Sequence, residues 1–438
     1  MRKILAISLS ALMMILGVMS PISASAATFN IDFNTTSESI SLVNLDTDST
    51  VYEKNPDMKR SPASITKIMT YIIVAENVND LEGSKIAISP DVIEELKGTD
   101  SLISNIKEGE TYSAYQLLNA LMISSGNDAA LALAHYVTGG NTSEFVNMMN
   151  KKAQDLGCDN THFVNPHGLY DAKQYTTTND MVKITKYALT MPYFSEISNK
   201  TVSYDLDDEW PLVTTNSLID PINGGSYYYR YAKGIKTGQL DEAGYCLVST
   251  AIKGGYTYLC VAMGAPIDSK NKNDINGAMV DSKTLYMWAF KNLEIKTVLK
   301  SEQPIGESNL KYAYKKDKVM LQPEKDLSAV LPIDVEISSI QVVKDYPDEI
   351  EAPIKEGEKV GTATLYYANE QIATINVVSG ETVQRSQLLY AIALANKIVT
   401  SKIFIALVIL IVILFVSYAF LVAIQNRQKA KNKRRYKR

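Results

Sequence analysis

The stretch from residue 60 to residue 78 constrains the fold most, because it sets a single lysine in a largely apolar run. Pro62 suits the loop or first turn before a helix, and the run beyond it predicts a helix buried on nearly all sides. Ser64 and Lys67 lie on one face of that helix. A buried ammonium is costly unless it is paired or loses its proton. Lys67 is therefore either a base for the Ser64 hydroxyl or a cation that extends to the surface.

The two ends of the chain carry signals for export and for a membrane. Residues 1–26 begin with basic residues, continue through an apolar core and end in Ala-Ser-Ala, which predicts a signal peptide or, alternatively, a retained N-terminal anchor. Residues 403–424 are apolar except for Ser417 and Tyr418. A helix of that length measures about 33 Å and spans a bilayer core of about 30 Å. The tail at 425–438 is basic and has no acid, which predicts a cytoplasmic C-terminus and a single-pass membrane protein with its main body extracellular.

The composition excludes several classes of function. Apart from the signal peptide and the basic tail, acidic residues outnumber basic ones, which argues against a nucleic-acid partner. Three cysteines, Cys158, Cys246 and Cys260, are too few for a disulfide framework. Three histidines without an H-E-x-x-H motif give little material for a zinc site. We therefore expect no metal, no cofactor and no nucleic acid.

Periodicity and turn signals divide the exported part into two folded regions. The first, residues 27–295, mixes helices with strands. Its expected elements are strands near 40–44 and 50–52, three consecutive antiparallel strands between 227 and 263, and helices at 113–123, 128–136, 145–156, 178–189 and around 285–293. Residues 300–380 alternate in short runs between Pro, Gly and Asn, which predicts a small β-sandwich domain. An amphipathic linker helix at 381–402 is expected to lead into the membrane helix.

Three short motifs stand in one order along the chain: Ser64-x-x-Lys67, Ser125-Gly126-Asn127 and Lys236-Thr237-Gly238. Each is common by itself, and Ser, Gly and Asn also serve as ordinary caps where two helices meet. Together, in an exported chain, they match the signature set of class A β-lactamases and penicillin-binding proteins.

On these residues the chain closely resembles the low-molecular-weight penicillin-binding proteins of the D-alanyl-D-alanine carboxypeptidase type, in peptidase family S11. The likeness covers residues 30–293, and less specifically the β domain at 353–357. Beyond the three motifs it includes the sequences at 62–70, 125–130, 165–169 and 243–245. The resemblance implies an α+β fold of the β-lactamase/transpeptidase type, with a five-stranded antiparallel sheet, helices on it and a helical subdomain.

The resemblance also implies the chemistry and the site. The substrate would be a peptidoglycan stem peptide ending in D-Ala-D-Ala, and β-lactam antibiotics would inhibit the enzyme. Ser64 would form the acyl-enzyme, Lys67 would take its proton and Ser125 would relay a proton to the leaving amine. The implied substrate-binding residues are Asn127, Lys236, Thr237, Gly238 and Gln239, with the main-chain N–H groups of Ser64 and Gln239 as the oxyanion hole.

The chain departs from the family pattern at two places, and two alternatives to the carboxypeptidase function stay open. Leu240 stands where the family often has a threonine, and residues 263–279 offer Lys270 and Lys272 in place of an arginine that helps to hold the substrate carboxylate. A β-lactamase is one alternative, although residues 165–168 lack the glutamate that class A enzymes use for deacylation. The other is a catalytically weak, membrane-anchored scaffold that binds the cell wall. We expect His167 to be structural, and likewise His135.

Overall fold

The computed structural model describes residues 29–99, 103–104, 106–206, 209–268, 270–271 and 274–435. The predicted signal peptide, residues 1–26, lies outside these ranges. The chain divides into two compact units. The first contains the described residues up to Val298 together with Ser328–Val342 and Leu365–Ala373, and the second contains Leu299–Leu327, Val343–Thr364 and the chain from Thr374 onward.

A five-stranded antiparallel sheet forms the centre of the first unit, as the sequence predicted. Its strands are β1 (Ser39–Asn44), β2 (Ser49–Lys54), β7 (Ala232–Leu240), β8 (Gly244–Lys253) and β9 (Tyr256–Ala265). The order across the sheet is β2-β1-β9-β8-β7. Three strands close in sequence therefore lie side by side, and β7 lies at an edge, with Thr237 opposite Leu247 of β8.

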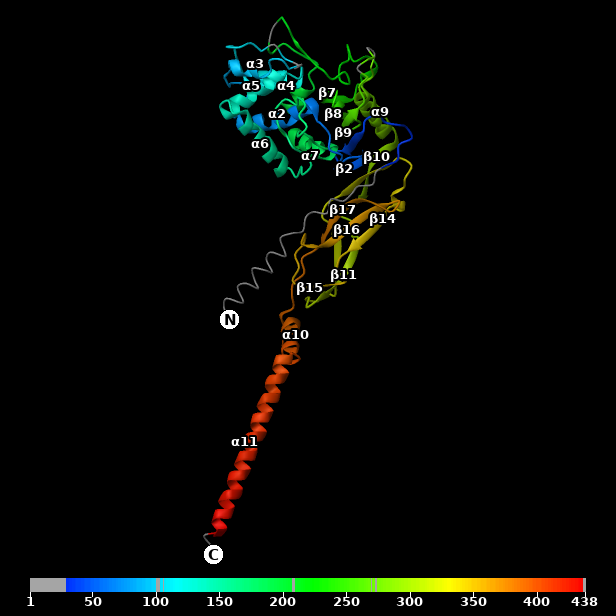
Figure 1. Cartoon of the computed structure of the whole chain (residues 1–438). Helices are drawn as coiled ribbons and strands as arrows, with labels where there is room; N and C mark the ends of the chain where they lie inside the picture. The colour runs from blue at the N-terminus through cyan, green and yellow to red at the C-terminus, as the bar shows by residue number, and fades with distance from the viewer. Residues whose placement is uncertain are drawn as a thin grey trace. The chain divides into compact units, whose positions relative to one another are not determined.

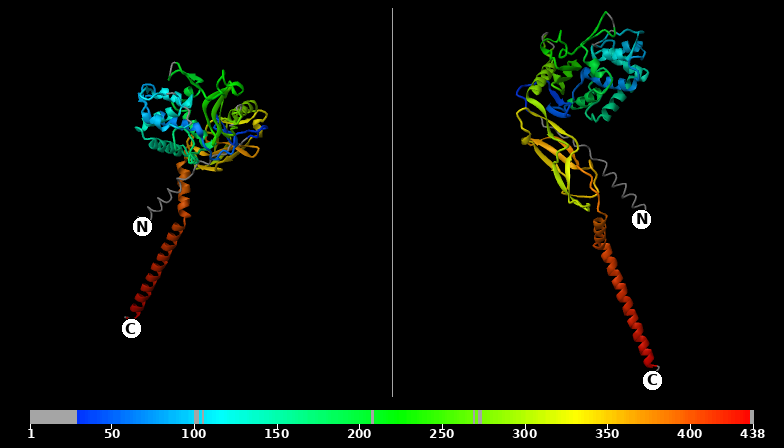
Figure 2. Two further views of the ribbon diagram at one scale, coloured as in Figure 1. Left: turned by 45° about the horizontal axis from the view of Figure 1, so that its top comes forward. Right: turned by 180° about the vertical axis from the view of Figure 1, so that it is seen from behind.

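Helices cover both faces of this sheet (Figures 1 and 2). The main ones are α2 (Lys67–Asn77), α4 (Ala114–Met122), α5 (Asn127–Thr138), α6 (Thr142–Asp155), α7 (Thr178–Ala188) and α9 (Gly277–Asn292). Shorter elements are η1 (Ala63–Thr66), α3 (Pro90–Glu95), α8 (Phe194–Ser198), η2 (Gly225–Tyr227) and the two-residue strands β3 (Ile86–Ala87), β4 (Thr111–Tyr112), β5 (Val202–Ser203) and β6 (Leu212–Val213). The five helices expected after residue 110 in this unit are all present.

The hydrophobic core has one layer on each face of the sheet, because side chains alternate along a strand. On β9, Leu259 and Val261 join the layer that packs under α2, α4 and α5. Tyr258 and Cys260 point the other way, into the layer that α9 covers. The apolar face of α9 therefore closes one side of the sheet, and the large helical cluster closes the other.

The start of the first long helix differs from the prediction. The chain after Pro62 forms the 3-10 turn η1 before the α-helix α2 begins at Lys67. Ser64 consequently lies in η1, and Ala63 has a positive φ of 47°. The tighter turn still leaves Ser64 and Lys67 on one side, because residues three apart eclipse each other in a 3-10 helix.

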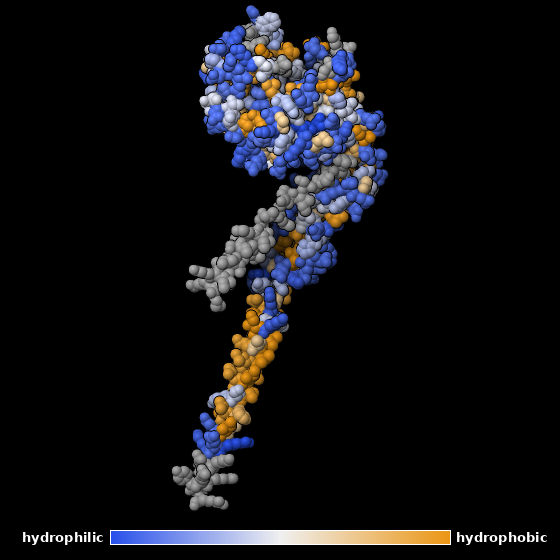
Figure 3. All heavy atoms as spheres, in the orientation of Figure 1, coloured by the Kyte–Doolittle hydropathy of each residue, from blue (hydrophilic) through white to orange (hydrophobic). Residues whose placement is uncertain are grey.

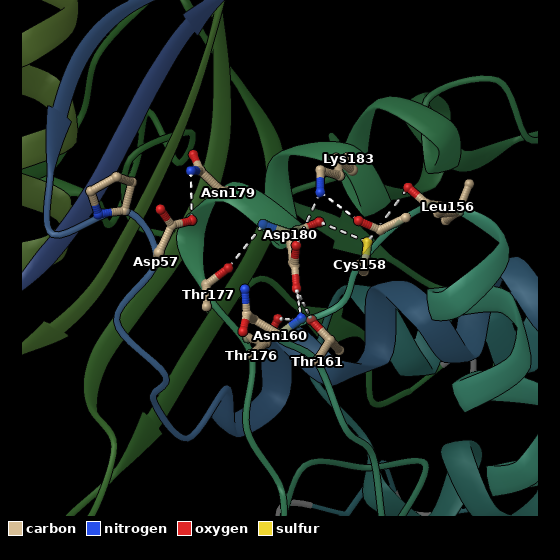
Figure 4. Close-up of polar contacts among 12 residues, drawn as sticks. Asp57, Leu156, Cys158, Asn160, Thr161, Thr176, Thr177, Asn179, Asp180 and Lys183 are labelled. Carbon is tan, nitrogen blue, oxygen red and sulfur yellow. Dashed lines mark hydrogen bonds and ion pairs between the residues drawn. The ribbon is translucent and has the colours of Figure 1, made fainter. Parts of the chain in front are cut away.

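A buried carboxylate fixes the loop that leads to residues 165–169 (Figure 4). Asp180, at the start of α7, is almost fully buried. Its carboxylate accepts hydrogen bonds from the main-chain N–H of Asn160 at 2.9 Å and from Thr161 Oγ1 at 2.8 Å. Lys183 Nζ lies 3.3 Å from the same carboxylate and compensates its charge. The sequence signals did not single out this group.

Residues 293–379, which are divided between the two units, consist mainly of strands, as predicted for an all-β domain. A six-stranded sheet has the order β14-β16-β17-β12-β11-β15, and β10 pairs with β13 in a separate two-stranded sheet. The bounds are β10 (Leu293–Leu299), β11 (Gly306–Lys311), β12 (Lys318–Pro323), β13 (Leu327–Pro332), η3 (Ile337–Ser339), β14 (Gln341–Asp345), β15 (Glu349–Glu351), β16 (Lys359–Tyr367) and β17 (Glu370–Ser379).

Two helices end the chain. The first, α10 (Gln387–Val399), begins at the cap Ser386, and the second, α11, runs from Lys402 to Arg435. Within α11 the stretch Lys402–Lys429 is long and apolar enough to cross a membrane. Hydrophobic side chains coat most of this stretch, and hydrophilic ones lie at its C-terminal end (Figure 3). The helix continues into the basic tail because lysine and arginine are good helix formers.

Candidate active site

The nucleophile candidate and the base candidate lie within hydrogen-bonding distance. Lys67 Nζ lies 3.0 Å from Ser64 Oγ. The Ser64 side chain is only partly buried, whereas Lys67 has no exposed surface at all. The hydroxyl can therefore meet a substrate while the amine is shielded from water. Of the two interpretations left open for Lys67, the structure excludes the one in which its charge extends to the surface.

The other contacts of Lys67 can engage both N–H groups of a neutral amine. Lys67 Nζ lies 2.6 Å from Asn127 Oδ1 and 2.5 Å from the main-chain oxygen of His167. Both oxygens can only accept hydrogen bonds, so Lys67 donates to each. A neutral amine has two N–H groups and one lone pair. With both N–H groups engaged, the lone pair is left for the Ser64 hydroxyl proton.

The surroundings favour that neutral form. Burial lowers the pKa of Lys67 well below its ordinary value, and the positive charge of Lys236 lowers it further. The carboxylate of Asp128 acts in the opposite direction with a smaller effect. Lys67 is therefore much closer to a base at neutral pH than an exposed lysine would be.

The main-chain oxygen of His167 was not anticipated. Asn165 Oδ1 accepts from the N–H of Gly168 at 2.7 Å, and Thr70 Oγ1 donates to the oxygen of Pro166 at 2.5 Å. A Cβ on Gly168 would lie 2.1 Å from the oxygen of Ala63, so this loop needs a glycine to approach η1. Burial lowers the pKa of the His167 ring to about 3 and keeps it neutral, which agrees with a structural role.

Ser125 lies in the turn between α4 and α5. Its φ is +65°, and the residue is 1% exposed. Ser125 Oγ has no hydrogen-bond partner within the described part of the chain. A buried hydroxyl without a partner, on a strained turn, is typical of a functional position.

The Ser125 turn is held from behind by Asp128. The carboxylate of Asp128 accepts from the N–H of Ser104 at 2.8 Å and from Ser104 Oγ at 2.6 Å. A Cβ on Gly126 would lie 1.9 Å from Ser104 Oγ, so the turn packs tightly on this segment. Asp128 therefore positions the turn that carries Ser125 and Asn127.

The edge strand β7 brings the third motif to the same place. A Cβ on Gly238 would lie 3.2 Å from the main-chain nitrogen of Ser64 and 3.0 Å from Ala63 Cβ, so β7 runs directly beside η1. Gln239 follows with an exposed side chain. Close packing of the two segments agrees with the implied oxyanion hole, whose donors are the N–H groups of Ser64 and Gln239.

Lys236 and Thr237 complete the polar surface of β7. Lys236 is 1% exposed, and burial lowers its pKa to about 7. Its Nζ lies 3.2 Å from the oxygen of Thr237. Thr237 Oγ1 is hydrogen bonded to Thr215 Oγ1, a residue that the sequence reasoning missed. No motif contains Thr215; only the folded chain brings it beside Thr237.

Residues 23–267 match the family model of D-alanyl-D-alanine carboxypeptidases, peptidase S11, and residues 294–385 match that of the C-terminal domain of penicillin-binding protein 5. A curated relative, D-alanyl-D-alanine carboxypeptidase DacF of Bacillus subtilis, is 30% identical over 350 residues, which are 79% of this chain and 85% of the relative. The crystal structure of penicillin-binding protein 5 from Haemophilus influenzae superposes with a TM-score of 0.68 at 25% identity, covering 82% of this chain and 100% of that one. The crystal structure of the D-alanyl-D-alanine carboxypeptidase DacD from Francisella tularensis superposes with a TM-score of 0.64 at 26% identity. This match covers 84% of this chain and 97% of that one.

Proposed function

The chain belongs to the S11 family of D-alanyl-D-alanine carboxypeptidases, and we propose that Ser64 is the nucleophile with which it removes the terminal D-alanine of peptidoglycan stem pentapeptides. The observation that carries this assignment is the contact of Ser64 Oγ with a wholly buried lysine of lowered pKa. A serine hydroxyl becomes nucleophilic only when such a base takes its proton.

The reaction proceeds in two steps. In the first, Lys67 takes the Ser64 proton while Ser64 Oγ attacks the carbonyl carbon between the two D-alanines. The N–H groups of Ser64 and Gln239 stabilise the resulting oxyanion; such donors are worth about 3 to 4 kcal/mol each. The carbon–nitrogen bond then breaks, and the leaving amine receives a proton through Ser125. In the second step water gives a proton to Lys67 and attacks the ester carbon. The bond from this carbon to Ser64 Oγ breaks, Ser64 Oγ takes the proton back from Lys67, and the shortened peptide leaves.

The remaining residues hold the substrate. Asn127 is fixed by Lys67 and orients the substrate amide with its side-chain NH₂. Lys236 supplies positive potential, and Thr237, together with Thr215, offers hydroxyl groups to the terminal carboxylate.

Penicillin should acylate Ser64 and then remain bound. Lys67 contacts Ser64, Asn127 and the main chain of His167, and none of these groups is a carboxylate that could activate a deacylating water. This arrangement favours the carboxypeptidase over the β-lactamase alternative.

We also propose that α11 anchors the protein in the cell membrane, with the peptidase part outside and the C-terminus in the cytoplasm. The length and apolar surface of α11 support the anchor. The basic residues that follow support the sidedness, because cytoplasmic flanks are enriched in lysine and arginine.

The assignment is tested by D-alanine release from a soluble pentapeptide ending in D-Ala-D-Ala. Ser64→Ala and Lys67→Met should each lose release by at least about a thousandfold. Lys85→Met, which changes an exposed lysine, should keep the wild-type rate. Equal release by wild type and Ser64→Ala would refute the assignment.

A further inference from the structure

A polar cavity of about 380 Å³ lies beside the active site, and no residue of the proposed mechanism lines it. Three segments form its walls. Residues 59–61 precede η1, residues 170–175 follow the loop that approaches Lys67, and Glu242 lies in the turn between β7 and β8. The cavity is therefore framed by the same three stretches of chain that hold Ser64, the oxygen of His167 and Gly238.

The cavity is within reach of a peptide bound at Ser64. Ser61 lines it and is three residues from Ser64, so their Cα atoms are at most about 11 Å apart. Glu242 is four residues beyond Gly238, which is at most about 14 Å along the chain. In the stem peptide, the residue before the acylated D-alanine carries a long amino side chain. Its tip lies about 10 Å from the acylated residue, from one residue step plus a four-carbon stem.

The charges on the cavity walls are of both signs and are not paired with one another. Glu242 makes no side-chain hydrogen bond or ion pair with the described residues, and among them the Asp171 carboxylate accepts only from the N–H of Lys173. Lys59 Nζ lies 4.4 Å from the centre of the Tyr175 ring and has no acidic partner in the described ranges. Arg60 differs, because it pairs with Glu38. Two carboxylates and one ammonium, none with an ion-pair partner among the described residues, thus belong to residues that line a common space.

We propose that this cavity is the subsite for the side chain of the diamino residue that precedes the two D-alanines. It would select a side chain that ends in both an ammonium and a carboxylate, as that of meso-diaminopimelate does, over one that ends in an ammonium alone, as that of lysine does. Glu242 and Asp171 bind the ammonium, Lys59 binds the carboxylate, and the half-exposed Tyr170 ring supports the methylene stem.

The proposal rests on the carboxypeptidase function and refines it. An ammonium-only side chain would satisfy the two acids, but it would leave Lys59 unmatched and place like charges close together. A zwitterionic end satisfies all three groups. Because the groups are exposed, each pairing changes affinity by only about two- to fivefold.

The test measures kcat and KM for D-alanine release from two soluble pentapeptides that differ only in the third residue, meso-diaminopimelate or L-lysine. The full-length wild type should have a KM about two- to fivefold lower for the diaminopimelate peptide, with similar kcat. Lys59→Gln should remove this difference by raising that KM alone. Glu242→Gln should raise the KM for both peptides. Lys173→Gln, an exposed lysine outside the cavity, should change neither.

Acylation by a small penicillin, which carries no diamino side chain, distinguishes a failure of the subsite proposal from a failure of the carboxypeptidase assignment. Its rate should be the same in wild type, Lys59→Gln and Glu242→Gln. If all variants react with penicillin and release D-alanine but show one KM for both peptides, the subsite is wrong and the carboxypeptidase assignment stands. If wild type neither reacts nor releases D-alanine, the proposed function itself is wrong.

Discussion

Two buried lysines decide the chemistry at the scale of single residues. In the proposed mechanism, Lys67 must be neutral to take the Ser64 proton, and Lys236 must be charged to attract a carboxylate. Burial lowers the pKa of both, that of Lys236 to about 7, so the two requirements oppose each other as the pH changes. A working enzyme therefore needs a pH at which Lys67 has lost its proton and Lys236 has kept one.

The pH profile of kcat/KM should accordingly be bell-shaped, since this constant reports ionisations of the free enzyme. Activity should fall at low pH as Lys67 gains a proton, and should fall again as the pH rises through about 7 and Lys236 loses its charge. Lys236→Arg keeps the charge at high pH and should remove the alkaline decline, even if its overall rate is lower. An unchanged alkaline decline in Lys236→Arg would assign it to another group.

Thr215 is the site residue that only the folded chain identifies. Thr215→Val keeps the shape of the side chain but removes the hydroxyl that contacts Thr237. The KM for a pentapeptide should rise about three- to tenfold, the value of one hydrogen bond to a charged or polar group. Thr190→Val, which removes an exposed hydroxyl bonded to the oxygen of Tyr187, is the matched control. Unchanged KM in Thr215→Val would show that carboxylate binding does not use this residue.

At the scale of helices and strands, the sequence predicts those features that neighbouring residues along the chain determine. The cap of α4 is one example: Ser113 Oγ accepts from the N–H of Gln116, and Gln116 Oε1 accepts from the N–H of Ser113, as the sequence pattern indicated. The strands β7 to β9 are another, because turns at 241–242 and 254–255 separate their alternating runs.

Sequence does not predict what tertiary packing determines. The 3-10 turn η1 forms where Gly168 and Gly238 press against Ala63 and Ser64, and no local signal encodes that contact. The oxygen of His167 reaches Lys67 through the main chain, so the residue type carries no information about it. The residues named for catalysis follow from the motifs, but their supports are long-range contacts of this kind.

The approach of β7 to η1 can be tested by adding one methyl group. Gly238→Ala would place a Cβ within 3.0 to 3.2 Å of Ala63 and the Ser64 nitrogen, which moves the strand outward. The rate of penicillin acylation should fall by about tenfold or more, because small displacements at a reacting centre are costly. Thermal stability should change little.

Gly255→Ala is a control with the opposite expected effects, because it should change stability and not acylation. This glycine lies in the β8–β9 turn with open space around it but a φ of +86°. The substitution should lower the stability by about 1 kcal/mol through backbone strain and leave acylation unchanged. If both variants lost acylation equally, the effect of Gly238→Ala would be general destabilisation.

At the scale of the whole molecule, α10 and α11 separate attachment from catalysis. A chain that ends at residue 386 loses both helices but keeps the segments that match the two family models. It should partition into the soluble fraction and release D-alanine from a soluble pentapeptide at the full-length rate. Full-length protein should stay with the membrane after a high-salt wash. Loss of the shortened chain's activity on the soluble peptide would contradict a purely anchoring role.

The most direct test of the central claim is to locate the penicillin adduct on the intact protein. After brief incubation with penicillin and digestion, mass spectrometry should find the added mass on the peptide that contains Ser64, and it should persist for minutes after excess drug is removed. An adduct on any other residue would contradict the account. The absence of any adduct on correctly folded protein would contradict it as well.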